Sequence, residues 1–383
     1  MQGVEIAHCH ATIKAVLSAA EALWHCSVEE VLRPMLRYDG KPDTLGMDAI
    51  PEITIMEILR AYDNYCVVIT EETGTSEKKR FSPSKDPSQF HTVYICDPTD
   101  RSSPFKKLLS EIEKRNVSVG EVVREPSFRK RWEEINGAPV EITGATSAVT
   151  CVRRGVPIFA VIVNYVTRQL FVSCGAGNYA LNLPDDVSGI SLDDVVKQGE
   201  KIFFRDVHSN GMRRFITFMG KSGYRENFIN SGLMDEGEMN ESLHYDLPGG
   251  PSRALYLSAL EPKDAPIGFV LANGEKITEW IHWLPFVRFA RKEYDQGEPA
   301  LKLYEICQDR PGTKEGILLS TSPPYSIFMP MDQGDMVVNV GRFADYENPS
   351  KIRSTLMVTS SDNRWATRVL NQYGHRSITF FSD

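Results

Sequence analysis

The sequence has no long hydrophobic run. No segment of its 383 residues approaches the roughly 18 consecutive apolar residues that a membrane-spanning helix requires. The N-terminus also lacks the basic region followed by an apolar stretch that marks a secretory signal. We therefore expect a cytoplasmic protein with no membrane partner.

Paired cysteines are missing as well. The seven cysteines are scattered along the chain, and no two of them form a Cys-x-x-Cys pair. An odd number without such pairs argues against a disulfide framework or a zinc ribbon, and favours a reducing compartment. Most of the cysteines stand among apolar neighbours, where the thiol is typical of a small core side chain.

No long block of basic charge is present. The chain has 43 Lys and Arg against 51 Asp and Glu, a formal net charge of -8. The densest basic runs, Lys78–Arg80 and Arg129–Arg131, are short and typical of solvated faces, so we expect no nucleic-acid polymer as partner. An acidic chain that handles an anionic substrate needs a local cation, which a bound metal ion can supply.

What the chain does have is enough length and apolar content for two cores. A chain of 383 residues with 42% hydrophobic and 25% charged residues is typical of a folded protein with two domains. The polar stretch Leu183–Glu200 reads as a linker. We therefore predict an N-terminal α+β domain over residues 1–200 and a C-terminal α/β domain over residues 201–383.

Apolar spacing predicts the main elements. Helical spacing is present over Val4–Cys26 and Asp48–Tyr62. Two short β-branched runs, Cys66–Ile69 and Thr92–Cys96, are typical of buried strands. Residues 103–132 are charged with helical patches and read as an insertion. The other predictions are a β-meander over 149–180, strands at 203–204, 215–219, 269–271 and 356–359, helices over 252–260, 280–291 and 363–373, and a long loop over 320–349.

Carboxylates stand directly after both predicted strands. Glu71 follows the first strand, Asp97 follows the second, and Asp100 lies three residues further on, across Pro98 and Thr99. An Asp-Pro-x-Asp turn can direct both carboxylates and the intervening carbonyl toward one point. Magnesium prefers hard oxygen ligands of this kind, and bound magnesium can activate water and neutralise a phosphoryl group. The pattern therefore predicts a magnesium site, although such a turn by itself is usually only a turn.

Ser102 comes next, where a helix can begin. The free backbone N–H groups of a helix N-terminus would face an anion, and the Ser102 hydroxyl could orient an attacking water. The simpler interpretation is that Ser102 only caps a helix, and the same alternative holds for Asp48. Both alternatives stay open at this point.

The order of these motifs resembles that of the inositol monophosphatase / fructose-1,6-bisphosphatase superfamily of magnesium-dependent, lithium-sensitive phosphatases. That family reads Thr…Asp-x-x-x-Glu, then Glu-Glu, then Asp-Pro-Ile-Asp-Gly-Thr. The corresponding residues here are Thr44, Asp48-Ala-Ile-Pro-Glu52, Glu71-Glu72 and Asp97-Pro-Thr-Asp-Arg-Ser102. Later blocks over 149–180, 250–260 and 356–370 are also similar. The resemblance therefore spans nearly the whole chain, with insertions near 103–140 and 306–350.

The resemblance implies a fold and a function. The implied fold is a two-domain α/β (α+β layered) protein, an alternating α-β-α-β-α sandwich with its site between the domains. The implied activity is Mg²⁺-dependent hydrolysis of a phosphomonoester on a small polyol, sugar or nucleotide by metal-activated water. The partner would be that small phosphorylated substrate, and assembly as a homodimer is frequent among family members.

The resemblance also implies site residues. The implied magnesium ligands are Glu71, Asp97, the carbonyl of Thr99, and Asp100. The residues implied to organise the attacking water are Glu71, Ser102 and Asp48. The phosphate would lie near Arg101 and Ser102.

Two departures from the family pattern leave the activity open. Arg101 stands where the family has Gly, which lets backbone amides approach the phosphate; its guanidinium could bind substrate or block the site. Ile281 stands where the family's Trp-Asp-x-Ala-Ala helix has a metal-binding Asp. Glu279 or His282 could replace that Asp only after a local shift, and a lone His is more often structural. A non-hydrolytic protein that binds a phosphorylated ligand is therefore the alternative function, and an assembly protein is a third.

Overall fold

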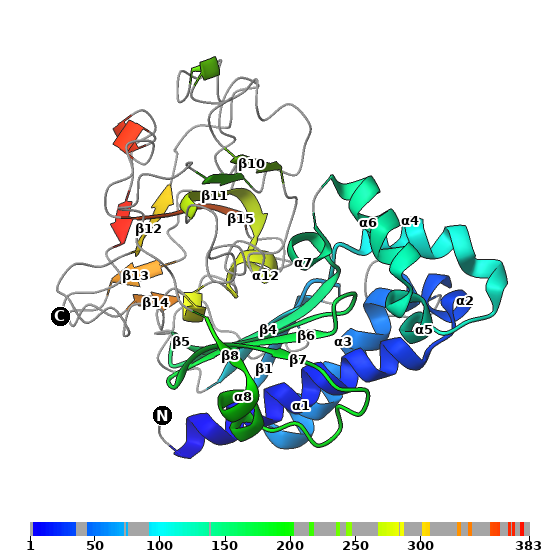
Figure 1. Ribbon diagram of the computed structural model, residues 1–383. Helices are drawn as coiled ribbons and strands as arrows, with labels where there is room; N and C mark the ends of the chain where they lie inside the picture. Colours follow the sequence, from blue (N-terminus) through cyan, green and yellow to red (C-terminus); the bar gives the residue numbers. More distant parts are fainter. Residues whose placement is uncertain are drawn as a thin grey trace.

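Three β-sheets, of eight, six and two strands, organise the part of the chain that the computed structural model describes (Figure 1). That part comprises residues 3–35, 44–72, 74–75, 92–137, 139–202, 214–217, 235–237, 243–246, 267–282, 284–286, 301–306, 328–330, 336–338, 353–360, 367–368, 370–371 and 376–378.

The eight-stranded sheet is formed by the segment that carries the sequence motifs. From edge to edge it contains β2 (Gly74–Thr75), β1 (Val67–Thr70), β3 (Val93–Asp100), β4 (Thr146–Arg153), β5 (Val156–Asn164), β6 (Gln169–Cys174), β7 (Gly177–Asn182) and β8 (Glu200–Lys201). β1 and β3 run parallel, and every other neighbouring pair is antiparallel. The β-meander predicted over 149–180 is therefore present as β4 to β7.

The six-stranded sheet is formed by the C-terminal half of the chain. Its order is β10 (Leu243–Asp246), β9 (Arg214–Thr217), β11 (Ile267–Lys276), β15 (Arg353–Ser360), β12 (Leu301–Ile306) and β16 (Arg376–Ile378). The first three strands are parallel and the remaining pairs are antiparallel. The two-stranded sheet pairs β13 (Phe328–Pro330) with β14 (Met336–Val338).

Two long helices cover one face of the eight-stranded sheet. They are α1 (Gly3–His25) and α3 (Gly46–Tyr62), which also pack on each other (Figure 1). Alternate strand residues share a buried core with both helices, because side chains of a strand point to opposite faces in turn. That core includes Val16, Leu23, Ile55, Leu59, Val149, Cys151, Val161 and Val163.

The opposite face of this sheet receives the segment 277–286. Thr150 and Asn178 lie on that face, since their neighbours in sequence belong to the helix-side core. The ring of His282 hydrogen-bonds the Thr150 hydroxyl at 2.7 Å, and the amide of Asn178 donates to the carbonyl of Phe286 at 2.9 Å. The short helix α12 (Ile277–Trp280) thus lies against the eight-stranded sheet, where it also contacts β3.

The elements therefore alternate in layers. In Figure 1, α1 and α3 lie below the eight-stranded sheet, α12 lies above it, and the six-stranded sheet follows. This order confirms the predicted layered α/β fold. The boundary predicted near residue 200 stays a prediction.

Shorter helices stand between the main elements. They are α2 (Val28–Leu32), α4 (Ser102–Ile112), the 3-10 turn η2 (Glu113–Arg115), α5 (Val119–Arg124), α6 (Pro126–Asn136), α7 (Val140–Thr143) and α8 (Leu192–Gln198). Of these, α8 lies away from the others, near the start of α1 (Figure 1). Ser27, Ser118 and Ser191 each cap a helix: the serine hydroxyl accepts from the backbone N–H three residues on. The carboxylate of that third residue accepts from the backbone N–H of the serine, so two N–H groups per helix are satisfied. Residues 103–132 thus form helices, as the helical patches indicated.

Several predicted boundaries were wrong. The prediction ended the second strand at Cys96, whereas β3 continues to Asp100. The predicted linker Leu183–Glu200 contains helix α8, and the predicted loop over 320–349 contains β13 and β14. Of the helix predicted over 280–291, residues 281–282 form a turn and residues 284–286 are helical, while residues 287–291 lie outside the described residues. The strand predicted at 203–204 and the helix over 252–260 lie outside the described residues.

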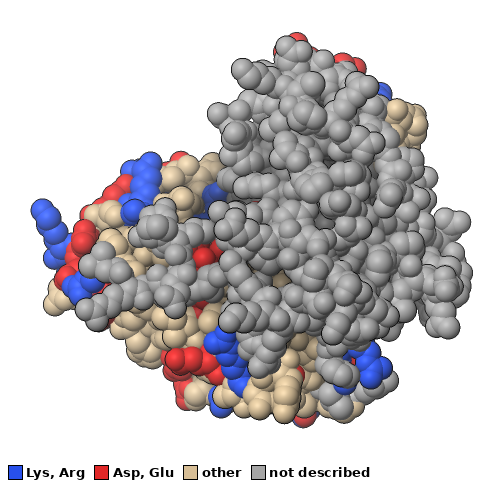
Figure 2. Space-filling model, turned by 180° about the vertical axis from the view of Figure 1, so that it is seen from behind, with Lys and Arg blue, Asp and Glu red and all other residues tan. Residues whose placement is uncertain are grey.

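The described surface carries charges of both signs. Figure 2 shows acidic and basic side chains interspersed over the described part of that face, without a large area of one sign. No described helix combines the length and the apolar content that a membrane span requires. Five of the six cysteines in the described residues are buried, as small core side chains should be.

We predict that His282 makes the folded protein less stable in mild acid. Burial lowers the pKa of His282 to about 4, and its Nε2 donates to the Thr278 carbonyl while Nδ1 accepts from Thr150. The unfolded chain, with a pKa near the usual value of 6.5, gains a proton that the folded chain excludes. The free energy of unfolding should therefore fall as the pH falls from 6.5 to about 4, by up to about 1.4 kcal/mol per pH unit.

Urea unfolding between pH 7 and pH 4.5 measures this effect. His282→Gln should show a shallower decline than the wild type, and His25→Gln, at an exposed position, should decline like the wild type. Equal slopes in the wild type and His282→Gln would refute the assignment.

Candidate functional site

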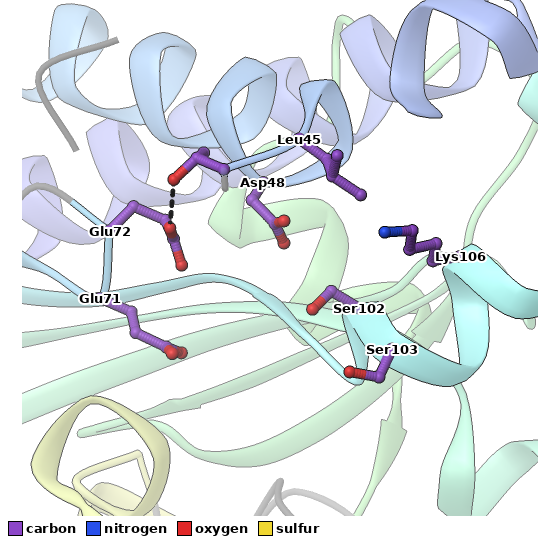
Figure 3. Close-up of a pocket in the computed structure, with 8 residues that line it drawn as sticks. Leu45, Asp48, Glu71, Glu72, Ser102, Ser103 and Lys106 are labelled. Carbon is purple, nitrogen blue, oxygen red and sulfur yellow. Dashed lines mark hydrogen bonds between the residues drawn. The ribbon is translucent and has the colours of Figure 1, made fainter. Parts of the chain in front are cut away.

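A pocket lies where helix α3, the end of β1 and helix α4 meet. Its volume is about 210 Å³, and it is lined by Thr44, Leu45, Asp48, Glu71, Glu72, Ser102, Ser103 and Lys106. Figure 3 shows the side chains of Asp48, Ser102 and Lys106 directed toward one shared space, with Glu71 at its edge. The three residues predicted to organise an attacking water, Glu71, Ser102 and Asp48, therefore share one pocket.

The start of helix α3 places Asp48 in this pocket. The N-cap of α3 is Leu45, so Asp48 lies in the first helical turn. The alternative that Asp48 only caps the helix is therefore wrong. Gly46 allows the helix to begin here, because a Cβ at this position would lie 2.4 Å from the carbonyl oxygen of Glu30 in α2.

Helix α4 places Ser102 on the opposite side. Its N-cap is Arg101 and no side chain caps it, so Ser102 is the first helical residue. The interpretation of Ser102 as a cap is also wrong. Backbone N–H groups of the first helical turn have no partner within the helix, and they favour a negative charge nearby. This end of α4 borders the pocket through Ser102 and Ser103.

The two glutamates after β1 have different surroundings. Glu72 accepts a hydrogen bond from the Thr44 hydroxyl at 2.6 Å (Figure 3). This bond connects the segment before α3 with the end of β1. Glu71 lines the same pocket, and its position follows from the pairing of β1 with β3.

The parallel pair β1 and β3 brings Glu71 and Asp97 together. Thr70 pairs with Cys96 in register, so the next residues in the same direction are Glu71, directly after β1, and Asp97, within β3. The register of β3 with β4 then shifts between Asp97 and Asp100. This irregularity is a bulge, and bulges redirect side chains at the end of a strand.

Two carboxylates, one on β3 and one on α3, are buried. Asp97 is 1% exposed and Glu52 is fully buried, and Glu52 accepts a hydrogen bond from the Thr70 hydroxyl. Burial raises the pKa of the Cys96 thiol, and the negative charges of Glu52, Asp97 and Glu71 raise it further.

This donor set fits magnesium in type and in backbone position. Carboxylate and carbonyl oxygens are the ligands that Mg²⁺ prefers; Glu71 directly follows β1, and Asp97, Thr99 and Asp100 belong to the C-terminal half of the neighbouring strand β3. Within the described residues, however, no three or more His, Cys, Asp or Glu side chains are grouped closely enough to hold a metal ion. The predicted ligand set therefore stays a prediction.

Arg101 adopts a backbone conformation that favours glycine. Its φ is 68° and its ψ is 29°, in the left-handed region. Its guanidinium donates to the side-chain oxygen of Asn136 in α6, and Arg101 is not among the residues that line the pocket. The phosphate contact predicted for Arg101 is therefore not formed by the described pocket, and it stays a prediction.

The residues predicted near a second ligand position are buried. Ile281 is fully buried and His282 is 1% exposed. Both ring nitrogens of His282 have partners, Thr150 and the Thr278 carbonyl. The prediction that His282 is structural agrees with these contacts. Glu279, on α12, is half-buried.

Lys106 is a candidate site residue that the sequence motifs did not indicate. It is exposed and lines the pocket from the second turn of α4. Its spacing of four residues from Ser102 could have indicated it, since residues four apart lie on the same face of a helix. That inference required the start of α4, which the motifs alone did not establish.

Comparisons with known proteins place this geometry in a known fold. No family model matches the sequence, and no curated protein matches it. The structure of CysQ from Bacteroides thetaiotaomicron, a bacterial member of the inositol monophosphatase family, does match. It is 14% identical and the match covers 94% of this chain and 98% of that chain, with a TM-score of 0.50. This chain has the inositol monophosphatase fold.

Two further structures are similar over most of their length. Inositol monophosphatase from Anabaena (Nostoc) sp. PCC 7120 is 11% identical over 95% of each chain, with a TM-score of 0.48. The suhB protein of Bartonella henselae is 11% identical over 95% of this chain and 97% of its own, also with a TM-score of 0.48. At such identities, structural likeness concerns the fold and not the activity.

We predict that glycine is better tolerated than alanine at position 101. Both substitutions remove the contact with Asn136, but only alanine keeps a Cβ in the left-handed region, which costs about 1–2 kcal/mol. Arg101→Gly should therefore be more stable than Arg101→Ala by about 1 kcal/mol in urea unfolding.

Arg33 is the matched control for this comparison. Its φ is -73°, where alanine has no such penalty, so Arg33→Ala should be at least as stable as Arg33→Gly. The same order of stability at both positions would show that the backbone of residue 101 is not strained.

Proposed function

We propose that this chain is a phosphatase that hydrolyses a phosphomonoester of a small polyol, sugar or nucleotide with Mg²⁺. The main support for the proposal is the pocket that Asp48, Glu71 and Ser102 line together, with Ser102 at the start of α4. The inositol monophosphatase fold supports a phosphatase-type function, because the structural neighbour CysQ is described as a member of that family.

In this proposal Glu71, Asp97, Asp100 and the Thr99 carbonyl would hold magnesium. When bound, Mg²⁺ lowers the pKa of water and offsets the negative charge of the phosphoryl group. The carboxylates of the chain alone would repel a phosphate, so the proposal requires this cation to make the pocket attractive to an anion.

The other pocket residues orient the reactants. Asp48 and Glu71 are hydrogen-bond acceptors, so they would position a water and accept its proton. The Ser102 hydroxyl can donate or accept, and it would fix the water or a phosphate oxygen. The N–H groups at the start of α4 would bind the remaining phosphate oxygens. The leaving alcohol would take a proton from solvent at the open side of the pocket.

Lys106 would bind the phosphate from the side of α4. Its ammonium group is directed into the pocket (Figure 3), and Lys106 is the one Lys or Arg among the residues that line the pocket in the described part of the chain. A lysine binds phosphate as a compact charge without fixed geometry. We therefore propose Lys106 as a phosphate ligand in addition to the contact predicted for Arg101.

The alternative is a protein that binds a phosphorylated ligand without hydrolysis. The burial of Ile281 and the two occupied ring nitrogens of His282 favour it, because these residues offer no side-chain ligand to a metal. Ligand binding without phosphate release would identify this alternative.

We predict that Asp97→Asn abolishes magnesium-dependent phosphate release. The amide keeps the shape but removes the negative charge that binds the cation, so kcat/KM should fall at least about 100-fold. The measurement is phosphate release from a panel of small phosphomonoesters with and without Mg²⁺. Asp193→Asn, an exposed residue of α8, is the matched control. Release that is unchanged in Asp97→Asn would contradict the proposed site.

We also predict that Lys106→Ala weakens phosphate binding. Loss of one charged contact at an exposed position should raise KM, and the inhibition constant for inorganic phosphate, by about 3–10-fold. Lys107→Ala is the matched control, because Lys107 is the next residue of α4, is exposed and does not line the pocket. Equal effects of both substitutions would indicate general electrostatics and no specific contact by Lys106.

A further inference from the structure

Two buried hydroxyl groups contact the turn that carries Asp97 and Asp100. The Thr99 hydroxyl lies 2.7 Å from the Met47 carbonyl oxygen and 2.7 Å from the Pro98 carbonyl oxygen. The Tyr165 hydroxyl donates to the same Pro98 carbonyl at 3.1 Å. Tyr165 is fully buried and Thr99 is 5% exposed.

Helix α3 contains the reason why Thr99 donates to Met47. The carbonyl of Met47 would normally accept from the backbone N–H four residues on, but that residue is Pro51, which has no N–H. A hydroxyl carries one proton and can donate to only one of two carbonyls. The Pro98 carbonyl already receives the proton of Tyr165, so the Thr99 proton satisfies the carbonyl that Pro51 leaves without its helical donor.

Tyr165 is itself held in place by the sheet and by α1. It follows β5, and its backbone N–H donates to the Ala145 carbonyl at 2.8 Å. The indole N–H of Trp24 donates to the Tyr165 carbonyl at 3.1 Å, and the two rings meet edge to face. A phenol is protonated near neutral pH, so the Tyr165 hydroxyl can donate to the Pro98 carbonyl.

We propose that Thr99 and Tyr165 are positioning residues that hold the Asp97–Asp100 turn against helix α3. The inference rests on the proposed function, since the turn carries three of the proposed magnesium ligands. Thr99 ties the turn to Met47, and the next residue, Asp48, lines the pocket. Tyr165 fixes the peptide between Pro98 and Thr99 from the sheet. Together they set the position of Asp97 and Asp100 relative to Asp48 on α3.

Isosteric substitutions test this proposal. Thr99→Val keeps the shape and removes the hydroxyl, Thr99→Ser keeps the hydroxyl, and Tyr165→Phe removes only the phenol oxygen. The readouts are Mg²⁺ binding by titration calorimetry, with the metal alone, and kcat and KM for the best phosphomonoester. We expect Thr99→Val and Tyr165→Phe to weaken Mg²⁺ binding about 3–10-fold and to lower kcat more than they raise KM. Thr99→Ser should stay within about twofold of the wild type.

Pro51→Ala separates positioning from stability. In the Thr99→Val background, this second substitution would supply the backbone N–H that the Met47 carbonyl lacks, so the melting temperature should recover. The turn would still be untethered from α3, so Mg²⁺ binding should stay weak. Recovery of Mg²⁺ binding together with stability would overturn the proposal, because Thr99 would then act only by stabilising α3.

The wild-type protein distinguishes this inference from the proposed function. If the wild type neither binds Mg²⁺ nor releases phosphate, the proposed function fails and the positioning role fails with it. If the wild type binds Mg²⁺ and the Thr99→Val and Tyr165→Phe variants bind it equally well, only the positioning role is overturned.

Discussion

The parallel pairing of β1 with β3 is the constraint on which the site depends. All the other neighbouring pairs of the eight-stranded sheet are antiparallel. In an antiparallel pair, the carboxyl end of one strand meets the amino end of the next. The single parallel pair brings two carboxyl ends to the same edge, so Glu71 and Asp97 become neighbours although 26 positions separate them. Helix α3 then crosses this edge with Asp48 in its first turn.

Concentrating carboxylates in this way opposes stability. Asp97 and Glu52 are both buried, and burying a charged carboxylate is costly. Arg101 adds a strained backbone conformation at the same turn. Local features that cost stability are typical of functional sites, where a ligand or a cation offsets the cost when it binds. The hydroxyl contacts of Thr99 and Tyr165 hold the turn in place in spite of this cost.

The far face of the sheet shows how the two halves of the chain are joined. Its contacts with segment 277–286 are partly polar, with His282 on Thr150 and Phe286 on Asn178. Buried polar groups must find partners, so these bonds specify one position for the segment more sharply than apolar contact alone. Both ring nitrogens of His282 are occupied by hydrogen bonds to Thr150 and to the Thr278 carbonyl. His282 is therefore structural, although it is next in sequence to the predicted ligand position at Ile281.

Local sequence determined the main elements and indicated Asp48, Glu71 and Ser102, which line the pocket. Period-3.6 and period-2 patterns located α1, α3, β1 and the meander, because amphipathic spacing reflects which side of an element is buried. The motif order indicated Glu71, Asp97, Asp100 and Asp48 together with the layered α/β fold. Tertiary structure decided the rest. Continuation of β3 to Asp100 depends on pairing with β4, and the place of Lys106 depends on where α4 begins.

The bond from Thr99 to Met47 shows the limit most clearly. Pro51 removes a hydrogen bond from α3, and that loss can be read from the sequence. The sequence does not show which group replaces the N–H that Pro51 lacks. Thr99 lies 52 residues from Met47, and its hydroxyl reaches the Met47 carbonyl only when β3 and α3 are packed together. A local sequence pattern shows that a backbone group of an element lacks its usual hydrogen-bond partner. Packing between elements decides which distant residue supplies that partner.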